Sequence, residues 1–375
     1  MFIGAPMFTV QEKKNFEELL YVAGPSGHEE IAIKEWVKQA KRFADRVYIN
    51  DLGSGVAIIE PTPIARGAWN DSGGYQHAVT LANPNAKTIL LDAHIDELGL
   101  TITHIDDEGI CWVHKIGGWD PLILLGQRVE IYSRKTNHLV AFGVIGRIPA
   151  HLQDDKDDED EVKIKDIWID IGASTKKETE EVVGIGDYVV IESRVTVLEG
   201  NKITSRALDD RAGCFTILKA LEIYSRQYDR RNRLVAVASL REEAGTSSTA
   251  RFPEFNPHEI IVVDVTHASD QPNTPLTIVG EHKLGSGPVI NVGTMISKKM
   301  IAKLEKIAES LKIPHTVEVN GGETFTNVDP SWLGAPRAEV GLVAIPLRYM
   351  HTPVEVIDLD DVENTAKLLA GYAGV

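Results

Sequence analysis

The chain has 375 residues and a formal net charge of −16 at pH 7, and 43% of its residues are hydrophobic and 25% charged. This composition is typical of a soluble globular protein, and the length predicts two domains. The negative charge disfavours nucleic acid and anionic membrane surfaces as partners. The two cysteines, Cys111 and Cys214, exclude a disulfide framework and a thiolate zinc site, which fits a reducing compartment.

The N-terminal residues lack the basic, apolar and small-residue order of a secretory signal, and Phe16 to Leu20 fits an ordinary helix. No apolar run in the sequence approaches the ~18 residues that a membrane span requires. We therefore expect a cytoplasmic protein without a membrane partner.

The N-terminal part of the chain predicts helices followed by a hairpin. Residues 8–45 fit two helices, the second opened by a capping-box spacing at Ser26-Gly27-His28-Glu29. Residues 47–60 fit a β-hairpin. Pro, Gly, Asn and Asp are frequent from Pro61 to Ala86, and we expect an exposed loop there.

Short predicted strands separated by turns extend from Ile102 to Val190. This spacing is typical of a small β-barrel or sandwich inserted into an α/β domain. An acid run at 154–161 lacks the glycine and oxygen-ligand spacing of a calcium loop, so we interpret it as a solvated loop. Helices and strands alternate again after Ser205. Acidic residues at the start of a predicted helix there can be explained by their favourable interaction with the helix dipole.

Four apolar runs fit strands that are buried on both faces, as in a parallel sheet. Each run is followed by histidine or carboxylate side chains, and together the four deliver His94, Asp96, Glu242, Glu243, Asp264 and His351. Because the carboxyl ends of parallel strands meet at one edge of a sheet, we expect these side chains to lie together. Imidazoles and carboxylates gathered there indicate a divalent metal site, an acid/base site, or both.

Five sequence blocks carry a resemblance to a known family. The blocks are Ala93–Glu97, Ala207–Gly213, Arg241–Gly245, Val263–Thr266 and His351–Glu355. In their order they resemble the signature blocks of the tetrahedral (TET-type) dinuclear-metal aminopeptidases, a family that includes glutamyl and deblocking aminopeptidases and members once labelled endoglucanases. The segment 165–174 also resembles the inserted domain of that family.

The resemblance implies a fold and a domain organisation. The fold class would be α/β, with a mixed, mostly parallel sheet flanked by helices in a zinc-exopeptidase-like catalytic domain. Residues 1–98 and 194–375 would form that domain. A PDZ-like β-barrel at 99–193 would be inserted into it and would mediate dimerisation. Six dimers would then enclose a hollow dodecamer that admits short peptides.

The resemblance also implies roles for single residues. His94 and Asp264 would bind one divalent metal ion, Glu243 and His351 a second, and Asp209 would bridge both. Glu242 would be the general base that activates water for peptide hydrolysis. Imidazole and carboxylate ligands suit Zn²⁺, with Co²⁺ as the next choice.

Three further residues bear on the site. Asp96 lies two residues after His94 and is placed to accept its second ring N–H. His267 and Asp270 follow Asp264 closely and are candidates to line a substrate pocket.

Other functions compete with this interpretation. A glycoside hydrolase needs two carboxylates at a defined separation and no metal, which leaves the strand-end histidines unexplained. A non-catalytic assembly protein would have no need of all six candidate residues. A deacylase or deblocking hydrolase on a related fold is the nearest alternative and would act on blocked rather than free N-termini.

The predicted substrate pocket departs from the family pattern. The segment Thr324–Val328 places Phe325 where the family usually has glycine and Asn327 where it usually has an acid. An acidic substrate side chain would need a buried cation, for which the candidates are Lys283 and Arg348. We therefore expect a preference for neutral apolar N-terminal residues, with Phe325 lining the pocket.

Overall fold

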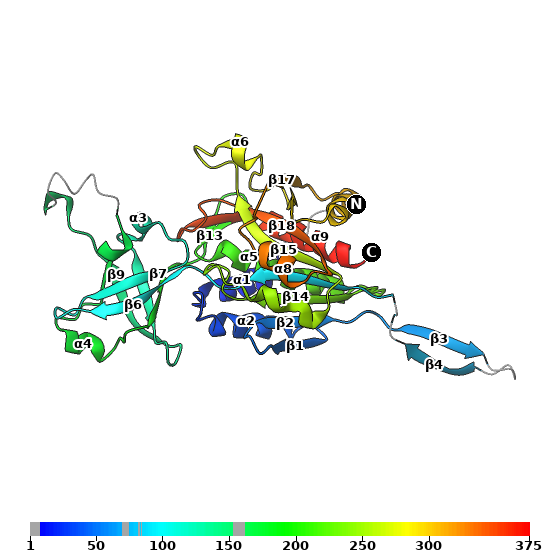
Figure 1. Cartoon of the computed structure of the whole chain (residues 1–375), viewed down its shortest axis with the longest axis horizontal. Helices are drawn as coiled ribbons and strands as arrows, with labels where there is room; N and C mark the ends of the chain where they lie inside the picture. Colours follow the sequence, from blue (N-terminus) through cyan, green and yellow to red (C-terminus); the bar gives the residue numbers. More distant parts are fainter. Residues whose placement is uncertain (1–7, 70–74, 82, 84, 153–161) are drawn as a thin grey trace.

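The structure is a computed structural model that describes residues 8–69, 75–81, 83, 85–152 and 162–375. An α/β body occupies the centre, a barrel lies at one end, and a β-hairpin arm projects from the other end (Figure 1). No helix in these described ranges is long and apolar enough to cross a membrane.

The body is built on an eight-stranded sheet with the order β1-β2-β14-β5-β15-β18-β16-β17. Its central strands run parallel and are almost wholly buried: β14 (Arg233–Ser239), β5 (Thr88–His94), β15 (Glu259–His267) and β18 (Glu339–Leu347). The outer strands are β1 (Arg46–Ile49), β2 (Gly55–Ile59), β16 (Val289–Gly293) and β17 (Thr316–Asn320). The four predicted apolar runs are therefore these four central strands. A strand that is covered on both faces is apolar on both faces, and its sequence is a continuous apolar run.

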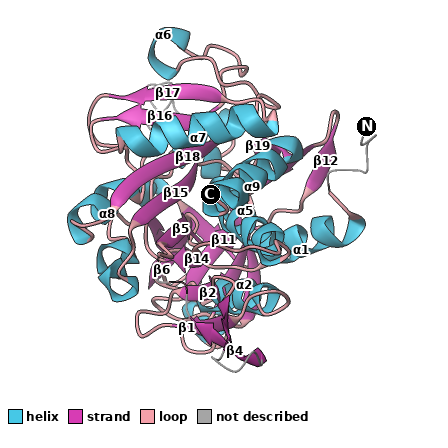
Figure 2. Ribbon diagram, turned by 90° about the vertical axis from the view of Figure 1, so that its right-hand side faces the viewer, coloured by secondary structure: helices cyan, strands magenta, loops and turns pink. Residues whose placement is uncertain are grey.

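Helices lie along both sides of this sheet (Figure 2). The helix α5 packs against β5 and β15, and α9 packs against α5, while α8 packs against β18. The helices and the small third sheet of the body are α1 (Val10–Tyr21), α2 (Glu30–Ala40), α5 (Leu208–Ser225), η3 (Ser248–Phe255), α6 (Leu276–Val279), α7 (Lys298–Leu311), α8 (Val328–Gly334), α9 (Leu359–Ala373), β12 (Thr196–Leu198), β13 (Lys202–Ser205) and β19 (Glu355–Asp358).

The inserted segment forms a closed barrel with the order β10-β7-β6-β11-β8-β9, and each described pair of neighbours is antiparallel. Its own apolar core is separate from that of the body. Its elements are β6 (Gly99–Ile105), β7 (Cys111–Ile116), α3 (Pro121–Leu124), β8 (Arg128–Tyr132), β9 (Leu139–Ile145), η1 (Ala150–Leu152), η2 (Ile164–Asp166), β10 (Trp168–Asp170), α4 (Lys176–Glu180) and β11 (Tyr188–Ile191). The predicted fold class, an α/β sheet with an inserted barrel, is confirmed.

Two local expectations were wrong. The stretch 61–86 is not a plain loop, because β3 (Ile64–Trp69) and β4 (Tyr75–Leu81) pair as an antiparallel hairpin. Ser26 does not cap α2: its hydroxyl donates instead to Asp96 Oδ2 at 2.6 Å, and the N-cap Glu29 makes no side-chain cap. The acid run 154–161 lies outside the described residues.

A buried charged group fastens α1 and α5 to the end of β5. Arg211, in α5, donates to the carbonyl oxygen of Leu19 at 3.0 Å and of Ile95 at 3.2 Å, and its Nη2 pairs with Glu97 at 2.8 Å. Arg206 pairs with the other oxygen of Glu97, and all three side chains are buried. One carboxylate therefore pairs with two guanidinium groups next to the carboxyl end of β5.

This group predicts a large effect of one substitution. Glu97→Ala should lower the free energy of unfolding by ~3–5 kcal/mol, because it leaves two buried guanidinium groups without a counter-charge. Glu192→Ala is the control: it removes an ion pair to Arg128, whose side chain is 76% exposed, and should cost at most ~1 kcal/mol. Urea unfolding of both variants measures this, and equal effects would contradict the account.

Candidate active site

The predicted site residues converge at the carboxyl edge of the parallel strands. His94 is the last residue of β5, Asp264 lies in β15, and Glu242 and Glu243 form the turn after β14. Two more elements reach the same place, since Asp209 lies in the first turn of α5 and His351 follows β18. The structure thus brings together side chains that are up to 257 positions apart in the chain, from His94 to His351.

Asp209 occupies the centre of this cluster. Its Oδ1 lies 3.2 Å from Nε2 of His94, and its Oδ2 lies 3.4 Å from Nε2 of His351. The same His351 nitrogen lies 3.5 Å from Oε2 of Glu243. On the other side, Nε2 of His94 lies 3.9 Å from both Asp264 and Glu242. The two oxygens of one carboxylate therefore face two separate groups of donor atoms.

Asp96 organises the two glutamates. Its carboxylate accepts the backbone N–H of Glu242 at 3.2 Å and of Glu243 at 3.1 Å, as well as the Ser26 hydroxyl. The Nδ1 atom of His94 lies 3.2 Å from the backbone carbonyl oxygen of Asp96 and 3.5 Å from its carboxylate, so the carbonyl is the closer partner. Asp96 thus fixes the turn that carries Glu242 and Glu243 as well as touching His94.

Two residues without a predicted role also belong to the cluster. Asp210 offers an oxygen within 4.8 Å of ligand atoms of His94 and Asp264. Glu355 accepts the backbone N–H groups of Asp209 at 3.2 Å and His351 at 3.0 Å. Both residues lie inside the sequence blocks that carried the family resemblance. That position in the sequence was the signal that could have identified them.

Burial and the nearby charges shift the pKa values of the carboxyl groups in this cluster. Burial raises the pKa of Glu243 and Asp264 well above their usual values, helped in each case by the nearby charge of Asp209. Burial raises the pKa of Glu242 to about 7. Burial alone would also raise the pKa of Asp209, but hydrogen bonds from His351 and His94 lower it. Several carboxylates are thus crowded into a space that disfavours their negative charge.

The side chains present fit divalent cations. Oε1 of Glu243 is buried and has no hydrogen-bond partner in the described part of the chain, which is costly for a carboxylate. Cations would satisfy this oxygen and offset the crowded negative charge. Imidazole nitrogens with carboxylate oxygens are a donor set that suits zinc, and a carboxylate shared by two donor groups is typical of two-metal sites.

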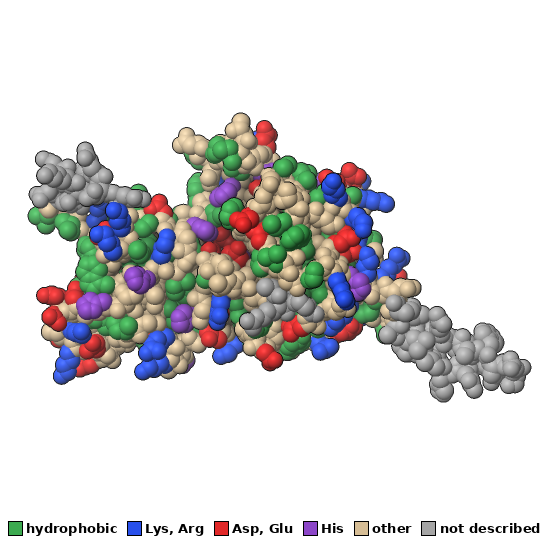
Figure 3. All heavy atoms as spheres, viewed as in Figure 1, with side chains coloured by type: hydrophobic (Ala, Val, Ile, Leu, Met, Phe, Trp, Pro, Cys, Tyr) green, Lys and Arg blue, Asp and Glu red, His purple; other side chains and the backbone are tan. Residues whose placement is uncertain are grey.

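A cavity of about 1030 Å³ opens on this cluster and includes His94, Asp209, Glu242, Glu243, Asp264 and His351 in its walls. Acidic side chains gather near the middle of one face of the molecule (Figure 3). Of the other predicted pocket residues, His267 lines the cavity, whereas Asp270 does not and pairs with Arg348. Phe325 lies at the mouth with 83% of its surface exposed, so it lines the entrance without closing it.

Asn327 lies deeper than Phe325. It is buried, and its Nδ2 donates to the Ser239 hydroxyl at 2.8 Å at the end of β14. The side chain therefore ties the wall of the cavity to the strand that precedes the two glutamates.

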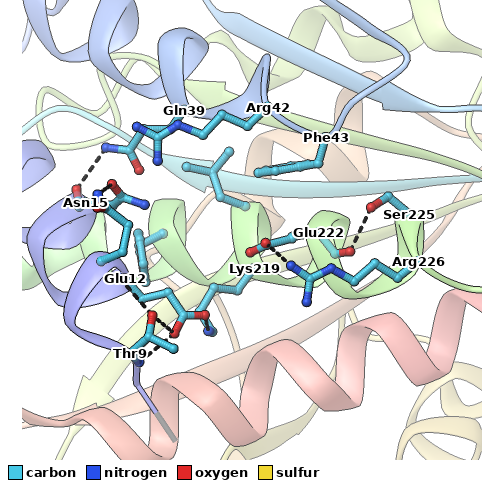
Figure 4. Close-up of a pocket in the computed structure, with 13 residues that line it drawn as sticks. Thr9, Glu12, Asn15, Gln39, Arg42, Phe43, Lys219, Glu222, Ser225 and Arg226 are labelled. Carbon is cyan, nitrogen blue, oxygen red and sulfur yellow. Dashed lines mark hydrogen bonds and ion pairs between the residues drawn. The ribbon is translucent and has the colours of Figure 1, made fainter.

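A second cavity, of about 600 Å³, lies between α1, α2 and α5 (Figure 4). Its charged walls are largely paired with one another: Lys219 contacts Glu12 at 2.6 Å, and Arg226 pairs with Glu222. It includes none of the residues of the strand-end cluster. The catalytic candidate is therefore the cavity over the strand ends.

Comparisons with known proteins agree with this site and fold. The family model of M42 glutamyl aminopeptidases matches residues 77–368. A lysyl aminopeptidase of Pyrococcus furiosus is 31% identical over 358 residues, covering 94% of each chain. An aminopeptidase structure from the archaeon Desulfurococcus kamchatkensis shares 30% identity with a TM-score of 0.83, over 97% of this chain and 94% of that one.

A third relative forms large assemblies. The TET1 peptidase of Pyrococcus horikoshii, which can assemble into a tetrahedron or a large octahedral shell, shares 27% identity with a TM-score of 0.78 over 96% of this chain and 99% of that one.

These matches span both the strand-end cluster and the barrel. They confirm the resemblance carried by the five sequence blocks, and they decide for peptide hydrolysis against glycoside hydrolysis and against a non-catalytic role. The chain belongs to the M42 glutamyl aminopeptidase family, and it is an aminopeptidase of that metal-dependent class.

Proposed function

We propose that this aminopeptidase uses two divalent ions, most suitably Zn²⁺, held by His94, Asp209, Glu243, Asp264 and His351. The observation that carries the proposal is the position of Asp209, whose two oxygens face His94 and His351 separately. His94 and Asp264 would hold one ion, Glu243 and His351 the other, and Asp209 both. Asp210 offers an oxygen within 4.8 Å of ligand atoms of His94 and Asp264, so it would be a further ligand for the first ion.

Glu242 is the proposed general base. Its side chain is 17% exposed and that of Glu243 only 5%, so Glu242 retains contact with the open cavity whereas Glu243 is enclosed. Ions held by these ligands would polarise the peptide carbonyl and lower the pKa of water. Glu242 is placed to hold the proton removed from the attacking water and to return it to the amine nitrogen of the leaving peptide.

The substrates are short peptides with a free N-terminus. The cavity of about 1030 Å³ is large enough for several residues of a peptide beside the cluster. A deblocking activity on acylated N-termini is the second candidate. Comparing hydrolysis of a free and an acetylated peptide of the same sequence separates the two.

The barrel is the proposed dimerisation element, with residues 1–98 and 194–375 as the catalytic domain and 99–193 as the inserted domain. Large apolar side chains of β9 are solvent-exposed in the single chain: Leu139 by 42%, Phe142 by 60% and Val144 by 47%. Such a patch is typical of a surface that another protein covers. We propose dimers that build a dodecamer, in the cytoplasm, as a chamber that admits only peptides.

Replacing Glu242 tests its role as a base. Glu242→Gln keeps the size of the side chain but removes its basicity, so kcat should fall by ~10²–10⁴-fold while metal content stays at the wild-type level. Glu243→Gln is the matched comparison and should lower metal content. Full activity of Glu242→Gln would show that the base is another group.

Asp96 should act through the turn that it fixes. Asp96→Asn replaces the carboxylate that accepts two backbone N–H groups. We expect metal affinity to fall ~10–100-fold, as it does when other residues that position metal ligands are replaced. Asp107→Asn, at an exposed position in the barrel, is the control and should change nothing. Metal-binding titrations measure both, and an unchanged affinity in Asp96→Asn would contradict the role.

The assembly is tested at the barrel surface. Phe142→Asp places a charge in the exposed apolar patch, so the dodecamer should dissociate into smaller species in sedimentation velocity. Tyr228→Asp alters a side chain of the catalytic domain that is 97% exposed, and it should sediment like the wild type. A wild-type chain that is monomeric at micromolar concentration would contradict the proposal.

A further inference from the structure

The catalytic cavity extends well beyond the metal-ligand cluster. Beyond the cluster its walls include Leu342 and Ala344 of β18 and side chains of β16 and β17, the two strands that follow β18 in the sheet. This far wall is polar, and it presents Asn291, Glu318 and Asn320. Asn320 Nδ2 donates to Asn291 Oδ1 at 2.6 Å, so these two amides hold each other in place.

Glu318 is anchored within reach of the cluster. Its Oε1 accepts the hydroxyl of Thr266 at 3.0 Å, and Thr266 lies two residues after Asp264 on β15. Two residues of a strand span ~7 Å, so the carboxylate lies about one long side chain away from the proposed metal ligand. Thr266 is the one described residue that contacts the Glu318 carboxylate by a hydrogen bond or ion pair, and it contacts Oε1 rather than the second oxygen, Oε2.

The described residues that line the cavity provide no lysine or arginine to balance this carboxylate. Lys283 is exposed and does not line the cavity, and Arg348 is engaged by Asp270. Glu323, an exposed residue of the cavity wall, adds a second carboxylate. An acidic substrate side chain would meet like charge here, whereas a cationic one would complete an ion pair.

We infer that Glu318 determines specificity, favouring peptides whose N-terminal residue is lysine or arginine. The inference rests on the proposed aminopeptidase site. A lysine stem of four methylene groups spans ~6 Å, so its carbon atoms can lie on Leu342 and Ala344 while the ammonium group reaches Oε2. The expected apolar preference is revised, because Phe325 stands at the mouth and the far wall is polar.

The test compares kcat/KM for lysyl, leucyl and glutamyl amides in three proteins. The wild type should cleave the lysyl amide at least ~10-fold better than the leucyl amide, and the glutamyl amide worst. In Glu318→Gln the lysyl-to-leucyl ratio should fall ~10-fold. Glu309→Gln removes the same charge from an exposed position on α7 and should leave the ratio unchanged.

Other results would overturn the inference. An equal loss on lysyl and leucyl amides in Glu318→Gln would show that Glu318 recognises a group common to all substrates, such as the α-amine. A wild-type preference for the leucyl or glutamyl amide would overturn it as well. In both cases the proposed hydrolysis still stands, whereas a metal-loaded wild type that cleaves none of the three amides would overturn the proposed function and this inference together.

Discussion

The carboxylate of Asp209 between two histidines is the constraint on which the rest of the site depends. Its oxygens contact His94 and His351, which arrive from opposite ends of the chain. Around it, burial raises the pKa of Glu243 and Asp264, so gathering several negative charges in this cluster is energetically unfavourable. Two cations would relieve this cost, and the binding energy of the ions would then stabilise the folded chain as well as prepare it for catalysis.

The scaffold supports that cluster through backbone groups. Asp96 accepts the N–H groups of Glu242 and Glu243, and Glu355 accepts those of Asp209 and His351. These two carboxylates hold the backbone of the segments that carry the candidate catalytic and metal-binding side chains. The position of each segment is therefore fixed by hydrogen bonds to its backbone. Parallel strands supply the common edge, because their carboxyl ends all point to one side of the sheet.

Sequence reasoning located most of this arrangement, because buried parallel strands are visible as apolar runs and each ended in a histidine or carboxylate. It could not assign Asp210, since two adjacent aspartates at a helix start are equally well explained by the helix dipole. It misassigned Ser26, whose capping-box spacing matched a local pattern although its partner, Asp96, is distant in sequence. The polar far wall was also missed, because Glu318 belongs to an outer strand whose alternating pattern gives no hint of the cavity.

The proposed mechanism depends on Asp209 being shared by two metal ions. Titration of metal-stripped protein with Zn²⁺, with ions counted per chain, is the decisive measurement. We expect two ions per wild-type chain, loss of affinity at both positions in Asp209→Ala, and loss of mainly one ion in His351→Ala. A single ion in the wild type, or two tightly bound ions in Asp209→Ala, would contradict it.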